Sequence, residues 1–226
     1  MIKAVIFDMY ETLITHYDSP LYFGRQMAAD AGIPESRFRS LWDASEQDRT
    51  IGKISLEEIL EKIMRKNRCY SDKLLARITE KRLEAKRECF RHLHPGILPM
   101  LTALKEQKLL TGLISNCYSE EAAAIRESVL LPYFDAVYLS WEQGVRKPDP
   151  EIYRRCMEHL SVKPEECLYV GDGGSGELEA ARDLGIKAVQ AVWYLRRGSG
   201  QPAAPKADFR QFGTPMDVVG FLEEVL

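Results

Sequence analysis

The sequence lacks the features that are typical of secreted, zinc-binding and membrane proteins. Its five cysteines are scattered and odd in number, and they include no C-x-x-C pair, which argues against a disulfide framework or a zinc site. No apolar run approaches the roughly 18 residues that a membrane-spanning helix requires. The segment Met1–Tyr10 is too short for a signal peptide and lacks its flanks. We therefore expect a cytoplasmic protein with reduced thiols.

An excess of charge of one sign is also missing. The chain has 31 Lys and Arg against 34 Asp and Glu, a net charge of −3. This balance provides neither a basic field for nucleic acid nor a polybasic anchor for a membrane. We expect a small-molecule partner instead, whose phosphate would need local positive charge from single lysines or helix N-termini. The composition leaves the oligomeric state open.

The pattern along the chain predicts an α/β fold. Its 226 residues suit one domain with a smaller insertion, or one large domain. Short apolar runs typical of buried parallel strands alternate with helical patterns, which favours a doubly wound, mostly parallel sheet. The runs cover residues 3–7, 109–115, 136–140, 168–170 and 188–192.

One long segment interrupts this alternation. Residues 17–91 contain no convincing strand, but Ser55 to Glu58 form a capping box before apolar residues at helical spacing. Residues 74–90 make a second helical pattern rich in Lys, Arg and Glu. We expect an all-helical cap over 17–91 and an α/β core formed by 1–16 and 92–226. Residues 198–205, rich in Gly, Pro, Ala and Ser, predict a flexible loop.

Polar groups directly follow the first two predicted strands. In an open parallel sheet the carboxyl ends of the strands converge on one crevice, where ligands bind. Asp8 opens the motif Asp-Met-Tyr-Glu-Thr-Leu after the first strand, and an Asp there can act as a covalent nucleophile. Ser115 and Asn116 end the second strand and can donate hydrogen bonds to an anion. Taken alone, the first motif also fits a solvated Asp in a turn, and the second also fits a Ser that caps a helix.

Two further motifs supply charge. The segment Arg146–Pro150 has two prolines that fix a loop, so that Lys147 is held as a point charge. The segment Gly171–Glu177 combines glycines, which permit close backbone approach, with the carboxylates of Asp172 and Glu177, which suit a hard cation. In isolation, the first of these two motifs also fits a solvated surface lysine, and the second also fits a glycine-rich turn with structural acids.

Together, in this order and spacing, the four motifs resemble the signature motifs of the haloacid dehalogenase-like hydrolase superfamily. The resemblance implies that Asp8 is the nucleophile, Ser115 binds the transferring group and Lys147 neutralises charge. It also implies that Asp172 holds magnesium, with Glu177 as a weaker, indirect partner. The helical insertion is similar to the cap that many members place between the first two motifs.

Other residues near these motifs complete the expected site. The backbone carbonyl of Tyr10 is a further expected magnesium ligand. Thr12, Asn116 and His16 are expected to contact the substrate, although a loop histidine more often touches only solvent.

Tyr10 departs from the phosphatase pattern of this superfamily. Phosphatases usually read D-x-D-x-T, and the second Asp protonates the leaving alcohol, whereas this chain has Tyr10 there. A phenol with an ordinary pKa near 10 is a poor proton donor at neutral pH. The 2-haloacid dehalogenases read D-x-Y-G-T, and their halide leaves without a proton. Tyr10 therefore favours dehalogenation, although Glu11 in place of the glycine matches that subgroup less well.

Asp172 favours the opposite interpretation. The dehalogenases resemble S-S-N-x-x-D in the fourth motif, without an acid at this position, and work without a metal. Asp8 and Asp172 in one crevice would repel each other unless a cation lies between them, and magnesium meets that need. The first expectation is thus a magnesium-dependent phosphatase for a small phosphorylated metabolite. The alternatives are a 2-haloacid dehalogenase and a non-catalytic binding or regulatory protein on this fold.

Overall fold

A computed structural model describes residues 1–195 and 203–225 of the chain. In this part of the chain one sheet has six strands in the order β3-β2-β1-β4-β5-β6, and every neighbouring pair is parallel. The strands are β1 (Ala4–Phe7), β2 (Leu110–Ser115), β3 (Ala136–Leu139), β4 (Cys167–Gly171), β5 (Lys187–Ala191) and β6 (Arg210–Phe212). The predicted α/β sheet is confirmed. The unpredicted sixth strand, β6, has three residues, two of them exposed.

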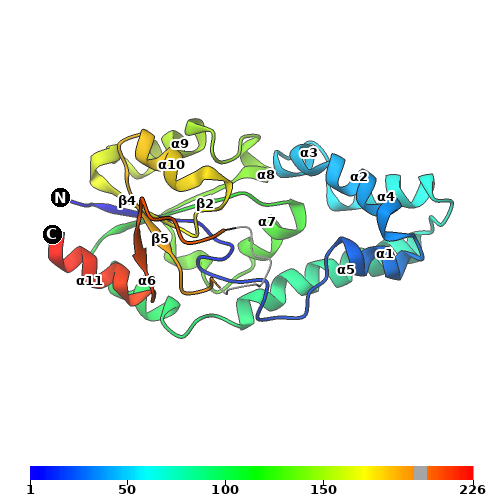
Figure 1. The fold of residues 1–226 in the computed structure, drawn as a ribbon, viewed down its shortest axis with the longest axis horizontal. Helices are drawn as coiled ribbons and strands as arrows, with labels where there is room; N and C mark the ends of the chain where they lie inside the picture. Colours follow the sequence, from blue (N-terminus) through cyan, green and yellow to red (C-terminus); the bar gives the residue numbers. More distant parts are fainter. Residues whose placement is uncertain (196–202, 226) are drawn as a thin grey trace.

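Helices cover both faces of the sheet (Figure 1). Because side chains alternate along a strand, Val5 and Phe7 of β1 join one core cluster while Ala4 and Ile6 join the other. The first cluster includes residues of α6 (Ile97–Glu106), α7 (Ser119–Arg126) and α11 (Met216–Val225). The second includes residues of α9 (Pro150–Leu160) and α10 (Glu177–Asp183). The short helix α8 (Ser140–Gln143) follows β3. This two-sided cover makes the fold doubly wound.

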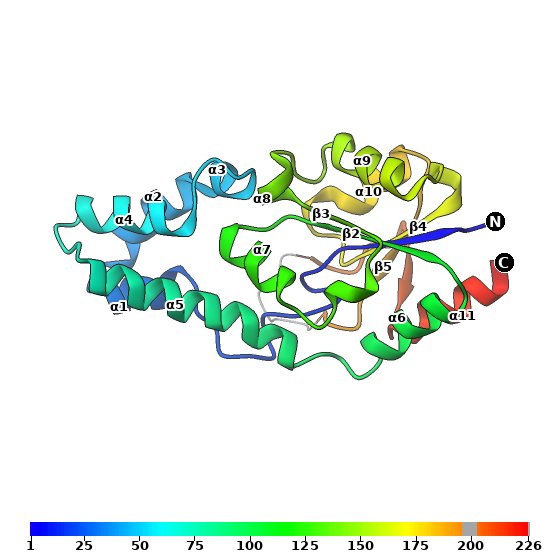
Figure 2. The same ribbon diagram turned by 180° about the vertical axis from the view of Figure 1, so that it is seen from behind.

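The chain from Asp8 to Glu88, all of which the structure describes, forms helices and no strand. These helices are α1 (Gly24–Ala31), α2 (Glu35–Ala44), α3 (Glu46–Thr50), α4 (Leu56–Lys66) and α5 (Asp72–Glu88). They lie to one side of the sheet (Figure 1, Figure 2) and enclose a hydrophobic cluster of their own that includes Phe38 and Trp42. The predicted capping box opens α4, since Glu58 N donates to Ser55 Oγ and Ser55 N to the Glu58 carboxylate.

The predicted flexible loop at 198–205 lies mostly outside the described residues. Its last part, residues 203–205, has no regular secondary structure. Within the described residues, no helix combines the length and the apolar character that crossing a membrane requires.

Candidate active site

The strand order brings the first and fourth motifs together. From β1 the chain adds β2 and β3 on one side of the sheet, and it then returns to add β4, β5 and β6 on the other side. The strand order therefore reverses between the neighbours β1 and β4, and ligand-binding crevices form at such a point. Asp8 follows β1, and its backbone N donates to Val170 O of β4 at 3.0 Å. Asp172 follows β4 directly, and Ser115 ends β2 on the other side of β1.

Lys147 lies at the centre of the charged groups. It is 2% exposed, and its Nζ donates to Asp8 Oδ1 at 2.5 Å, to Glu177 Oε2 and to the Tyr169 hydroxyl at 3.1 Å. The Asn116 side chain fixes the lysine backbone: Lys147 N donates to Asn116 Oδ1 at 2.8 Å and Asn116 Nδ2 donates to Lys147 O at 2.9 Å. Asn116 therefore holds Lys147 in place, in addition to lining the cavity described below.

The carboxylates of Asp8, Asp172 and Glu177 form a compact buried group. One oxygen of each lies within 4.8 Å of the others. Burial, followed by the charge of Glu177, raises the pKa of Asp8 to about 7, and burial, followed by the charge of Asp8, raises the pKa of Asp172 to about 6. Burial also raises the pKa of Glu177. Within the part of the chain that the structure describes, Lys147 is the one cation paired with these three carboxylates. The group therefore has the charge and the oxygen donors that suit a divalent cation.

The glycine-rich loop after β4 orients two of these carboxylates. Gly174 N donates to Asp172 Oδ1 at 2.9 Å, and Gly173 N donates to Glu177 Oε1 at 3.2 Å. A side chain at Gly171 would overlap the Glu177 carboxylate. The absence of a Cβ at position 171 is therefore a requirement for placing Glu177 beside Lys147.

The turn after Asp8 adopts a conformation that favours glycine. Glu11 has a φ of 61°, which costs energy for a residue with a side chain. Its carboxylate offsets part of that cost, because it accepts hydrogen bonds from Thr15 Oγ1 at 2.7 Å and from His16 N at 3.1 Å. Thr12 donates from Oγ1 to Asp8 Oδ2 at 3.3 Å, which helps to orient that carboxylate.

Two predicted site hydroxyls are fully enclosed. Thr12 and Ser115 are both 0% exposed and neither lines the cavity. The Ser115 hydroxyl has no hydrogen-bond partner among the described residues. A buried polar atom without a partner costs free energy unless a ligand or water supplies one.

Tyr10, at the position of the phosphatase general acid, packs among aromatic and charged side chains. Its ring stacks on His16 with centroids 4.5 Å apart, and Lys86 Nζ lies 5.5 Å from its centre. Its hydroxyl has no hydrogen-bond partner within the described part of the chain. Burial, followed by the charge of Glu121, raises the pKa of Tyr10 well above its usual value. The phenol is thus a weaker acid here than in water.

A cavity of about 770 Å³ lies between the sheet edge and the cap helices, a size typical of small-molecule sites. It brings together most of the predicted site residues: Asp8, Tyr10, His16, Asn116, Lys147, Asp172 and Glu177. On the cap side, Arg25, Arg39 and Trp42 line it. Burial, followed by the charge of Lys86, lowers the pKa of His16 well below its usual value, which favours the neutral imidazole.

Four charged residues beside this site were not predicted from the sequence, and two of them, Arg82 and Glu121, line the cavity. Arg82 and Lys86 of α5 form buried ion pairs with Glu120 and Glu121 of α7. A possible signal was the spacing of Arg82 and Lys86, which puts them on one face of a helix. However, α5 carries charged residues throughout, and the spacing alone does not tell which are buried.

Comparisons with known proteins identify the family. A model of the haloacid dehalogenase-like hydrolase family matches residues 2–185, so this chain belongs to that family, as its four motifs predicted. It is 29% identical over 224 residues to a glyceraldehyde 3-phosphate phosphatase of Methanopyrus kandleri, covering 92% of this chain and 90% of the relative. It is 29% identical over 230 residues to a phosphorylated carbohydrates phosphatase of Thermotoga maritima, covering 99% and 100%.

The fold also resembles solved structures of the family. The structure of a 2-haloacid dehalogenase from Pseudomonas syringae pv. Tomato superimposes with a TM-score of 0.72 at 20% sequence identity, covering 100% of both chains. The phosphatase names among the sequence relatives agree with the predicted hydrolase class.

Proposed function

We propose that this protein is a magnesium-dependent phosphatase that acts on a small phosphorylated metabolite. The observation that carries the proposal is the buried group of Asp8, Asp172 and Glu177, whose three carboxylates have Lys147 as their one paired cation among the described residues. This arrangement adjoins a cavity of small-molecule size. The relatives of nearly full length are phosphatases by name. We further propose a core of residues 1–16 and 92–226 and a cap of residues 17–91.

The proposed reaction has two steps, transfer of the phosphoryl group to Asp8 and hydrolysis of the aspartyl-phosphate. An Asp8 oxygen attacks phosphorus in line, forming an Oδ–P bond while the bond from phosphorus to the leaving oxygen breaks. Water then attacks the aspartyl-phosphate and releases inorganic phosphate and the free carboxylate. Lys147 offsets negative charge on the nucleophile and the phosphoryl group. The Ser115 hydroxyl is enclosed and unpartnered in this structure, and its proposed role is to donate to a phosphoryl oxygen once a substrate opens the site beside it.

The donor set fits magnesium. Asp8, Asp172 and the Tyr10 backbone carbonyl would hold the ion, and Glu177, which already binds Lys147 and Tyr169, would act on it indirectly. When bound, magnesium supplies positive charge against the carboxylates and the phosphoryl oxygens.

Tyr10 supports dehalogenation as a second candidate function. No carboxyl stands where phosphatases have their general acid, and the raised pKa of the Tyr10 phenol makes it a poor substitute. A halide leaves without a proton, so a dehalogenase has no need of this acid.

One substrate panel tests the two functions against each other. Aryl phosphates, acyl phosphates and 2-chloro acids are incubated with the protein in magnesium and, separately, in chelator. The phosphatase proposal predicts phosphate release that requires magnesium and no chloride release. Chloride release that persists in chelator, without phosphate release, would instead establish the dehalogenase.

The absence of a general acid predicts that the reaction rate depends steeply on the leaving group. Aryl and acyl phosphates, whose leaving groups depart as anions, are expected to react at least about 10²-fold faster than alkyl phosphates, because general acid catalysis is worth about 10²–10⁴-fold. Tyr10→Asp is expected to narrow this gap in rate between the two kinds of substrate, if the new carboxyl reaches the leaving oxygen. The matched control is Tyr10→Phe, which keeps the ring on His16 and should leave the gap unchanged. A gap that widens in Tyr10→Phe would show that the phenol is itself the acid.

The raised pKa values predict how stability depends on pH when metal is removed. The pKa of Asp8 is about 7 and that of Asp172 about 6 in the folded protein, above the 3.8 of an ordinary Asp. Between about pH 4 and pH 7 the folded state therefore binds more protons than the unfolded state, so these two groups lower the free energy of unfolding as the pH rises. In chelator at about pH 8, Asp172→Asn should be more stable than wild type by roughly 1–3 kcal/mol.

Urea unfolding midpoints at about pH 5 and pH 8 measure this effect, with and without magnesium. Magnesium should stabilise the wild type at the higher pH and should stabilise Asp172→Asn much less. An Asp172→Asn variant that is less stable than wild type in chelator at about pH 8 would contradict the assigned repulsion.

A further inference from the structure

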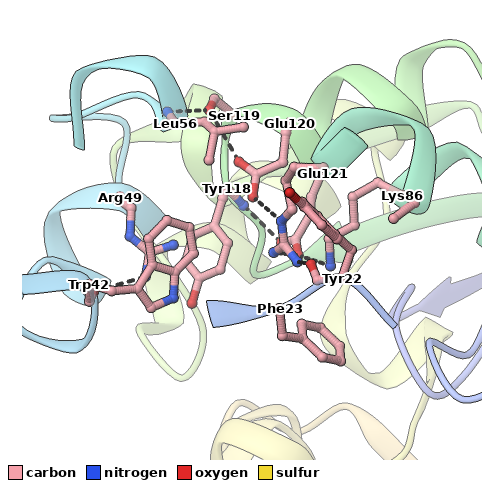
Figure 3. Close-up of polar contacts among 12 residues, drawn as sticks. Tyr22, Phe23, Trp42, Arg49, Leu56, Lys86, Tyr118, Ser119, Glu120 and Glu121 are labelled. Carbon is pink, nitrogen blue, oxygen red and sulfur yellow. Dashed lines mark hydrogen bonds and ion pairs between the residues drawn. The ribbon is translucent and has the colours of Figure 1, made fainter. Parts of the chain in front are cut away.

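The cap helix α5 docks on the core helix α7 through a buried cluster of four charges (Figure 3). Arg82 Nε lies 3.0 Å from Glu120 Oε1, Arg82 Nη2 lies 3.5 Å from Glu121 Oε1, and Lys86 Nζ lies 2.7 Å from the same Glu121 oxygen. Figure 3 labels Lys86, Glu120 and Glu121 of this cluster. All four side chains are at most 7% exposed. Two cations thus face two carboxylates, and the cluster is balanced.

The two cations of this cluster keep Glu121 ionised. Burial alone would raise the pKa of Glu121, but Lys86 and Arg82 hold it at about 2. Arg82 is further held by Tyr22, whose backbone carbonyl accepts from Nη1 at 2.6 Å. Because all four side chains are buried, removing one partner leaves another charge buried without compensation.

Glu121 has a second set of contacts that leads to the active site. Its other oxygen, Oε2, accepts a hydrogen bond from Tyr118 N at 3.0 Å, at the start of α7. Tyr118 follows Asn116 by two residues, and Asn116 exchanges two hydrogen bonds with the backbone of Lys147. Lys147 in turn contacts Asp8. A continuous series of polar contacts and short chain segments therefore joins α5 to the proposed nucleophile.

Two more contacts from the cap reach the same short segment of the core. The Arg49 guanidinium lies between the rings of Trp42 and Tyr118, at 3.8 and 4.0 Å from their centres. Leu56 N donates to Ser119 Oγ at 3.0 Å. Figure 3 shows these contacts beside Glu120 and Glu121. The cap therefore contacts Tyr118 and Ser119, which lie just after the motif at the end of β2.

We propose that Glu121 is a positioning residue, through which Lys86 and Arg82 of the cap set the loop of Asn116 and hold Lys147 in place beside Asp8. Docking of the cap then controls the geometry of the catalytic groups as well as the shape of the cavity. The kinetic part of the test rests on the proposed phosphatase function, whereas the spectroscopic part does not.

Two substitutions break the connection at different points. Glu121→Gln keeps a side chain that serves in a capping box but removes its charge. Lys86→Met removes the cap cation, and Lys86 does not line the cavity, so substrate contact is not altered directly. With magnesium and an aryl phosphate, both variants should lower kcat by about 10²-fold, the size of effect that a misplacement of about 1 Å produces, with KM changed far less. Lys86→Arg, which retains the charge, should restore most of kcat.

The chain offers a matched control on the same two segments. Arg87 of α5 pairs with Glu127 just beyond α7 at 2.7 Å, but their side chains are 32% and 52% exposed. Arg87→Met and Glu127→Gln should leave kcat at the wild-type value, since exposed pairs contribute little.

Nuclear magnetic resonance gives a readout that does not depend on turnover. In Glu121→Gln and Lys86→Met, the side-chain amide of Asn116 and the backbone amide of Lys147 should shift, and in Arg87→Met they should not. Folded Lys86→Met with wild-type signals at both positions would overturn the inference, as would an equal loss of kcat in the Arg87 and Glu127 variants. Signals that shift in these two variants, together with a wild type that releases no phosphate, would remove the proposed function and leave the inference standing.

Discussion

Asp8→Asn is expected to abolish turnover while leaving the protein folded. An amide is not a nucleophile toward phosphorus, and loss of a nucleophile in comparable enzymes lowers kcat by about 10⁴-fold or more. The fold should survive because asparagine has the same shape and because Lys147 keeps Glu177 as a partner. Burial and Glu177 raise the pKa of Asp8 to about 7, so removing this charge also relieves repulsion among the carboxylates. Phosphate release from an aryl phosphate in magnesium measures the loss.

Asp183→Asn is the control for this experiment. Asp183 ends α10, the helix that begins at Glu177, and its side chain is 76% exposed. The same chemical change there should leave turnover at the wild-type value. Phosphate release by Asp8→Asn at the wild-type rate would contradict the proposed role of Asp8.

Lys147→Met is expected to destabilise the protein and to lower its activity together. Methionine keeps much of the length of the side chain but leaves Asp8, Asp172 and Glu177 without the ammonium group that lies among them. Removing one partner of a buried charge group costs about 3–5 kcal/mol, and this loss should appear in chelator at about pH 8. Magnesium should recover part of it, because the cation pairs with the carboxylates. Turnover should fall by about 10²–10³-fold, the loss typical of a group that stabilises transition-state charge.

Urea unfolding in chelator and in magnesium measures the stability, and Lys105→Met is the matched control. Lys105 also forms an ion pair, with Asp135 at 2.7 Å, but the two side chains are 33% and 37% exposed. Its removal should cost less than about 1 kcal/mol. Equal stability losses in the two lysine variants would show that the charge cluster around Lys147 has no special role in the fold.

The sheet and the central charges were predictable because local signals decide them. Short apolar runs that end in polar motifs indicate parallel strands, and the carboxyl ends of such strands meet at one edge. This reasoning was enough to predict that Asp8, Asp172 and the lysine of the third motif lie together. The strand β6 was missed because three residues with two exposed side chains give no apolar run.

The contacts of the cap were not predictable in the same way. Helix α5 carries charged residues on all sides, so its sequence does not indicate that Arg82 and Lys86 are buried while Arg87 is exposed. Their burial depends on Glu120 and Glu121, which are distant in the chain and meet α5 only after the fold forms. Tyr10 was interpreted by comparison with a general acid, and only the structure places its ring on His16.

The covalent state of Asp8 during turnover tests the central claim most directly. The magnesium-loaded wild type is mixed with an acyl phosphate, quenched in acid and digested with a protease. The mass of the peptide that contains Asp8 is then measured by mass spectrometry. The account predicts a gain of one phosphoryl group at Asp8, absent from the Asp8→Asn variant. An unmodified Asp8 during active phosphate release, or a carboxyalkyl group on Asp8 formed from a 2-chloro acid in chelator, would contradict it.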